Sequence, residues 1–118
     1  MYKLKKTYTF DAAHKLKNTQ SLTSKKCTRL HGHRWKVKVE IITKRIINDM
    51  VIDFGRLKEI IDLLDHRNLN DVLKFNPTAE NIAGFLYGTI ETHLDPELEP
   101  KLKVTVEESP GAKVTYWE

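Results

Sequence analysis

The stretch HGHRWKVKVEI, residues 31–41, alternates one side chain at a time between two chemical classes. The first class is apolar or imidazole and consists of His31, His33, Trp35, Val37, Val39 and Ile41. The residues between them are mostly charged. Because successive side chains of a β-strand point to opposite faces of a sheet, this period of two predicts a half-buried strand. His31 and His33 therefore point the same way.

Other strands can be placed around this one. Residues 2–14 also alternate and predict a strand that ends at His14, with Tyr8, Phe10, Ala12 and His14 on one face. After a turn near Asn48 and Asp49, MVIDF at 50–54 indicates a return strand. LKVTVEES at 102–109 and AKVTYW at 112–117 flank a Pro-Gly turn and predict a hairpin.

Two helices are expected between the predicted strand at residues 50–54 and the predicted hairpin that begins at residue 102. Asp53 is a suitable N-cap for a helix with an apolar stripe over residues 54–64. Thr78 is a suitable N-cap for a second helix, which buries a stripe over residues 82–90 and ends before Pro96.

The predicted order is strand, strand, strand, helix, helix, strand, strand, within a single domain of residues 1–118. This order indicates an α+β fold, an antiparallel sheet with both helices on one face. Four or five strands are too few to close a barrel alone, so exposed sheet edges are expected to pair in an oligomer.

The composition sets further bounds. Cys27 is the single cysteine, so no internal disulfide can form. The chain shows neither an apolar signal-peptide run near its start nor a stretch long enough to cross a membrane, and a cytoplasmic location is expected. A net charge of +4 suits an anionic partner without identifying it.

Three histidines form a candidate metal site. His31 and His33 are two positions apart on one strand, about 6 to 7 Å between Cα atoms, and His14 on the first strand can supply a third ligand. Three histidines with an open fourth position are typical of a catalytic zinc. A closed set that included Cys27 would instead indicate a structural zinc, and the two remain open at this point.

Two acidic positions are further candidates. Asp65 could orient His66 as a general acid or base, although His66 could equally be a histidine placed favourably at a helix C-terminus. Glu107 and Glu108 point to opposite faces of one strand, and Glu108 shares the face of the apolar residues. An inward carboxylate is costly unless it is paired or binds a ligand; the alternative is a strand-end carboxylate in solvent.

Six motifs together resemble a known family. FDAAHKL, CTRLHGH, MVIDFGRLK, LDHRNLND, NPTAEN and VTVEES occur in the order and spacing of the 6-pyruvoyltetrahydropterin synthase family. The gap of three residues between Cys27 and His31 resembles the 6-carboxy-5,6,7,8-tetrahydropterin synthase branch of queuosine biosynthesis. The animal-type pyruvoyl enzymes have a longer gap, and an aldolase branch has a glutamate where residues 28–30 are Thr-Arg-Leu.

The resemblance implies the centre of an active site. His14, His31 and His33 match the zinc ligands of the family. Cys27 matches a catalytic thiol that is not a ligand.

It also implies residues around that centre. Asp65 and His66 match an acid/base dyad, which in this family comes from a neighbouring subunit. Glu108 matches the carboxylate that anchors the pterin, and Thr78 resembles a further pterin contact.

The implied function is zinc-dependent conversion of 7,8-dihydroneopterin triphosphate to 6-carboxy-5,6,7,8-tetrahydropterin, acetaldehyde and triphosphate. The implied fold is the tunnelling fold, in which subunits join their sheets into a barrel, commonly as a hexamer. The alternative on the same substrate is pyruvoyl formation by triphosphate elimination. A nucleic-acid-binding domain is not favoured, because no strand interleaves aromatic and basic residues.

Overall fold

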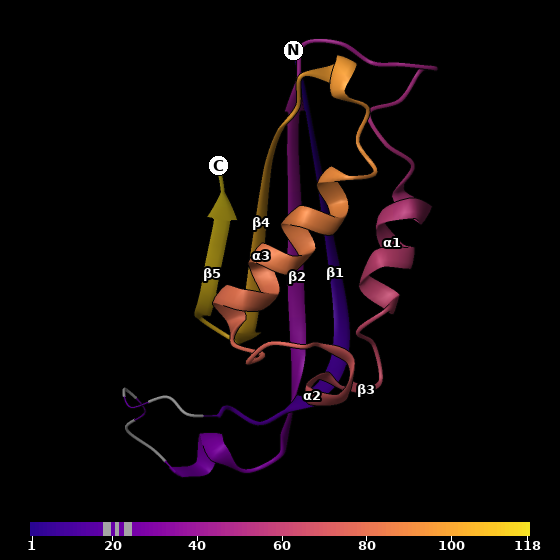
Figure 1. The fold of residues 1–118 in the computed structure, drawn as a ribbon. Helices are drawn as coiled ribbons and strands as arrows, with labels where there is room; N and C mark the ends of the chain where they lie inside the picture. Colours follow the sequence, from indigo (N-terminus) through magenta and orange to yellow (C-terminus); the bar gives the residue numbers. More distant parts are fainter. Residues whose placement is uncertain (18–19, 21, 23–24) are drawn as a thin grey trace.

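The protein is built on two long strands that pair along their whole length (Figure 1). We describe a computed structural model, which covers residues 1–17, 20, 22 and 25–118. Strand β1 spans Tyr2–His14 and β2 spans His31–Thr43, antiparallel, with Tyr2 opposite Thr43 and His14 opposite His31. Both strands lie where their alternation predicted them.

Three more strands complete a mixed sheet. Strands β4 (Lys101–Ser109) and β5 (Ala112–Trp117) form the predicted hairpin, which turns at Gly111 with a φ of 85°. The strand order is β3-β1-β2-β4-β5. Strand β3 (Arg67–Asn68) runs parallel to β1 beside Ala12 and Ala13. The expectation of a purely antiparallel sheet was therefore wrong at this edge, because β2 and α1 lie between β1 and β3 in the chain and bring it back to β1 in the same direction.

The predicted helices cover one face of the sheet. Helix α1 spans Phe54–Asp62 and α3 spans Ala79–Glu91, and both lie on the same side of the strands in Figure 1. The side chains of Asp53 and Thr78 accept hydrogen bonds from the first turns of these helices, as predicted for N-caps. Short elements fill the connections: η1 (Lys25–Thr28), α2 (Leu69–Val72) and η2 (Pro96–Leu98).

The predicted return strand at residues 50–54 was wrong. Asn48 and Asp49 make a tight turn with positive φ values of 51° and 67°, and only a single bridge joins Ile47 to Met50. The capping role of Asp53 starts α1 almost at once, so too few residues remain to form a strand.

The core lies between the sheet and the two long helices. Trp35 is fully buried, stacks on Phe10 with ring centroids 5.9 Å apart, and donates its ring N–H to the carbonyl of Ala12. His14 is also fully buried, at the end of this apolar layer. Among the described residues, we find no helix with the length and apolar character that crossing a bilayer requires.

Candidate metal centre

Three histidines converge at the end of the sheet where β1 ends and β2 begins. Antiparallel pairing places His14 opposite His31, and His33 follows on the same face of β2. One ligand atom from each ring lies within 4.8 Å of the others. Of the residues that the structure describes, these three alone form such a group, so Cys27 is outside it. The three predicted ligands thus lie close enough together to hold a metal ion.

Backbone carbonyls orient two of the rings. His14 Nδ1 lies 2.8 Å from the carbonyl oxygen of Pro77, and His31 Nδ1 lies 2.7 Å from that of Arg29. A carbonyl can only accept, so Nδ1 carries the proton in both rings. In a neutral ring Nε2 then has a free lone pair, the form in which histidine binds a metal.

The surroundings of His14 and His33 suit a bound cation. Their Nε2 atoms are buried and make no hydrogen bond to the described residues, which is uncommon for buried polar atoms. Burial is the main cause that lowers the pKa of both rings. The hydrogen bond to Pro77 opposes it at His14, Glu108 opposes it at both rings, and the neighbouring histidines lower the pKa further. Both rings are therefore neutral near pH 7. The unpartnered nitrogens and the neutral rings fit a divalent ion such as zinc.

Glu108 borders the histidines. Its carboxylate oxygen Oε1 lies 3.2 Å from His33 Nε2, without the alignment of a hydrogen bond. The β4–β5 register shifts between Glu107 and Ser109, next to this contact. The inward orientation predicted for Glu108 is confirmed, and its role as a pterin anchor stays a prediction.

Cys27 lies on η1, close in space to the end of β1. Its carbonyl oxygen accepts a hydrogen bond of 2.8 Å from the backbone N–H of Leu16, two residues after His14. The thiol is half-buried and free. This hydrogen bond keeps η1 beside the strand that carries a predicted metal ligand.

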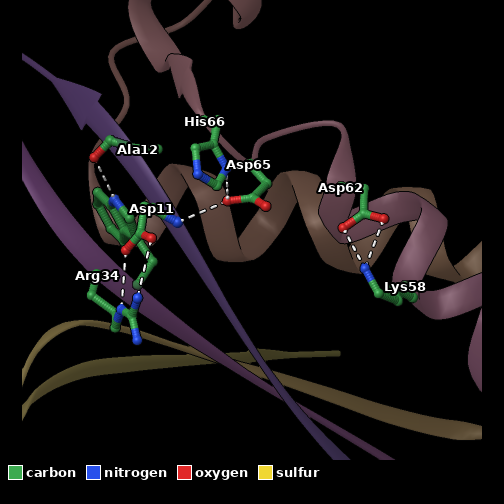
Figure 2. A network of polar contacts seen from close by, with 8 residues as sticks. Asp11, Ala12, Arg34, Lys58, Asp62, Asp65 and His66 are labelled. Carbon is green, nitrogen blue, oxygen red and sulfur yellow. Dashed lines mark hydrogen bonds and ion pairs between the residues drawn. The ribbon is translucent and has the colours of Figure 1, made fainter.

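Asp65 and His66 form a pair attached to β1 (Figure 2). The Asp65 oxygen Oδ1 lies 2.9 Å from His66 Nδ1 and accepts a hydrogen bond of 3.0 Å from the Asp11 N–H. That backbone bond is the main cause that lowers the pKa of Asp65, and His66 adds to it, against an opposing effect of partial burial. The N–H of His66 in turn donates to the Asp11 carbonyl at 2.7 Å.

The pair faces solvent rather than the histidine group. His66 has a φ of 58° and a side chain that is 78% exposed. His66 and His33 line one open hollow of about 570 Å³, together with Arg34 and Arg67. Figure 2 also shows the two hydrogen bonds, of 3.1 and 3.3 Å, from Arg34 to the Asp11 carboxylate. The Asp65–His66 pair therefore lies at the surface beside the candidate metal centre, and its catalytic role stays a prediction.

Thr78 has a structural contact in this structure. Its hydroxyl accepts a hydrogen bond of 3.1 Å from the N–H of Asn81 in the first turn of α3. The preceding residue, Pro77, holds His14 through its carbonyl. Sequence reasoning did not find Pro77 and Arg29 as supports of the site, because every residue carries a carbonyl and the side chain gives no signal of its use.

The family model described as 6-pyruvoyl tetrahydropterin synthase matches residues 3–118. The chain belongs to this family. It is 35% identical over 102 residues to a 6-carboxy-5,6,7,8-tetrahydropterin synthase of Synechocystis, an alignment that covers 77% of this chain and 76% of the relative. It is 36% identical over 96 residues to a dihydroneopterin monophosphate aldolase of Pyrococcus furiosus, covering 78% and 77% of the two chains.

The fold agrees with the family. The solved structure of 6-pyruvoyl tetrahydropterin synthase from Caenorhabditis elegans superimposes with a TM-score of 0.75 at 28% identity, over 99% of this chain and 95% of that one. The α+β expectation is confirmed for the single chain, and the joining of its sheet into a barrel stays a prediction.

Proposed function

We propose that this protein is a zinc-dependent lyase that converts 7,8-dihydroneopterin triphosphate to 6-carboxy-5,6,7,8-tetrahydropterin, acetaldehyde and triphosphate, a step of queuosine biosynthesis. The observation that carries the proposal is the group of three converging histidines, in which the buried Nε2 atoms of His14 and His33 make no hydrogen bond to the described residues, in a chain of this family. Relatives named 6-carboxy-5,6,7,8-tetrahydropterin synthase support the choice of reaction.

The chain's own residues divide the work. His14, His31 and His33 would hold the zinc, which when bound would polarise the side-chain oxygens of the substrate and acidify adjacent C–H and O–H groups. Glu108 beside His33 would orient the pterin by accepting hydrogen bonds from its amino-pyrimidine edge.

Proton transfer would use groups on two sides of the substrate. Cys27 would exchange a proton with the substrate side chain from η1. Asp65 would hold and orient the His66 ring as the second acid or base, because its carboxylate lies 2.9 Å from Nδ1. Thr78 would contact the pterin through its hydroxyl proton or its second lone pair, because the N-cap bond from Asn81 uses only one lone pair.

We further propose that the sheets of several subunits join into a barrel, with a hexamer as the family expectation. Strand β5 is the last in the sheet, and the two residues of β3 cover the outer edge of β1 only at Ala12 and Ala13. Unpaired edges of this length favour pairing with another chain. Such pairing would let His66 act in a neighbouring subunit's site.

The test is incubation of the zinc-loaded protein with 7,8-dihydroneopterin triphosphate and identification of every fragment by mass spectrometry. Acetaldehyde with the carboxypterin supports the lyase. A pyruvoyl product without acetaldehyde would support the alternative synthase activity instead. A Cys27→Ala variant is expected to keep stoichiometric zinc and lose turnover, whereas loss of zinc with the thiol would indicate a structural site.

The aldolase activity named for one relative is a third outcome of the same assay. It is not favoured, because residues 28–30 are Thr-Arg-Leu and contain no carboxylate.

A further inference from the structure

The face of the sheet turned away from α1 and α3 holds the positive charge of the chain. The strand register places eight basic side chains on it: Lys3, Lys5, Arg34, Lys36, Lys38, Lys101, Lys103 and Lys113. It places three acidic side chains there: Asp11, Glu40 and Glu107. The net charge of this open face is therefore +5, whereas the net charge of the whole chain is +4. The rest of the molecule is therefore close to neutral.

A hollow of about 360 Å³ lies in the middle of this open face. Its lining consists of Thr7, Lys36, Lys38, Glu40, Thr105, Glu107, Lys113 and Thr115. These residues come from four neighbouring strands, on the opposite side of the sheet from the core. The hollow is thus separate from the histidine group, whose side chains lie on the core side.

The charges in the hollow are only partly compensated. Glu40 lies 3.4 Å from the ammonium group of Lys38 and 3.6 Å from that of Lys3. Lys36 and Lys113 form no ion pair with any described residue. Glu107 stands between these two lysines in the cross-strand register and supplies one charge against their two. An anion bound here would gain contacts with ammonium groups that are otherwise exposed to water.

The donors suit phosphate oxygens in a row. Lys36 on β2 and Lys113 on β5 are two strand spacings apart, about 9 to 10 Å between backbones, which exceeds the size of a single phosphate and fits a chain of phosphates. The hydroxyls of Thr105 and Thr115 lie 2.7 Å apart, so one of them donates a hydrogen bond to the other. The hydroxyl that accepts this bond keeps its own proton, which is free to donate to an anion.

Nucleic acid fits the hollow less well. Single strands bind through aromatic side chains on which bases stack, and no aromatic ring lines the hollow. Trp117 lies on the same face but outside the hollow, with the Lys103 ammonium group 5.7 Å from its ring centroid.

We propose that the hollow of the open face binds a linear oligophosphate, with Lys36 and Lys113 as its principal cationic contacts. The site does not depend on the proposed function, although the triphosphate expected from that reaction belongs to the same chemical class. Binding would be strongly salt-dependent, because lysine–phosphate contacts are electrostatic.

The test is calorimetric titration of the full-length, metal-free protein with inorganic tripolyphosphate at low and at physiological salt. Replacing both lysines (Lys36→Gln with Lys113→Gln) is expected to weaken binding by about tenfold or more, through loss of two charge-assisted contacts. The matched control, Lys17→Gln with Lys74→Gln, removes the same charge at two lysines outside the open face that form no ion pair with the described residues, and is expected to change the affinity less than about twofold. Lys36→Arg keeps the charge and should keep binding.

Three results would overturn the proposal. Equal losses in the two double variants would show that only net charge matters. Sulfate binding as tightly as tripolyphosphate would show no preference for a phosphate chain. Tighter binding of a short thymidine oligonucleotide would identify a nucleic-acid partner instead. Because the titration uses neither zinc nor the pterin, its outcome is independent of the proposed activity.

Discussion

Zinc binding should stabilise the fold, and replacing His31 should remove that effect. His31 is the ligand of choice for this experiment because it is only half-buried, so His31→Ala leaves the core intact, whereas His14 is fully buried. His93 is an exposed histidine on the connection after α3, and His93→Ala serves as the matched control.

The size of the effect follows from the length of the chain. For 118 residues the entropy of unfolding near the midpoint is about 0.25 kcal/mol per kelvin. Free zinc at about 100 times its dissociation constant adds about 2.7 kcal/mol to the stability, which raises Tm by about 10 °C. If loss of one histidine ligand weakens zinc binding about 100-fold, zinc at the same concentration stabilises the fold by only about 0.4 kcal/mol, and the zinc-induced rise in Tm falls below about 2 °C.

Differential scanning calorimetry with and without zinc measures both values. The wild-type protein and His93→Ala should show the full shift, and His31→Ala should show almost none. An undiminished shift in His31→Ala would refute the three-histidine site. A shift that disappears equally in Cys27→Ala would show that the thiol is a ligand.

Three further predictions concern residues around the site. Trp35→Ala should lower the free energy of unfolding by about 3 to 5 kcal/mol, since Trp35 is fully buried; an unchanged urea midpoint would contradict this. Thr78→Ala should cost about 1 kcal/mol by removing the N-cap of α3, and Thr78→Ser should recover most of it; equal losses in both would exclude capping as the cause. The lowered pKa of Asp65 means that its stabilisation is present above the usual aspartate pKa and lost as pH falls below it. Asp65→Asn should therefore cost about 1 kcal/mol at pH 7, and the difference in urea unfolding should vanish near pH 2; a difference independent of pH would contradict this.

Local patterns predicted the long elements well. The alternation over residues 31–41 and the matching one ending at His14 placed both strands and both histidine-bearing ends. The N-caps at Asp53 and Thr78 marked the starts of the two main helices. These signals are reliable because side-chain periodicity and capping depend only on neighbours in the chain.

Short and non-local elements were not predictable in this way. Strand β3 has two residues, too few to show a period, and exists because Arg67 and Asn68 meet β1 after a crossover. The stretch 50–54 has the composition of a strand, but its only strand-type pairing is the single bridge from Met50 to Ile47, and the capping of α1 by Asp53 ends it. A strand needs a neighbour for its backbone hydrogen bonds, and local sequence does not identify that neighbour.

The amino-acid sequence by itself determined the two alternating strands, their helices and the common face of His31 and His33, because these follow from periods of two and 3.6 residues. It also carried the motifs by which the chain belongs to its family. Only the tertiary structure decided that His14 pairs opposite His31, that the carbonyls of Pro77 and Arg29 orient the rings, and that lysines of four strands share one face. Those relations join residues far apart in the chain, and strand register and packing alone bring them within bonding distance.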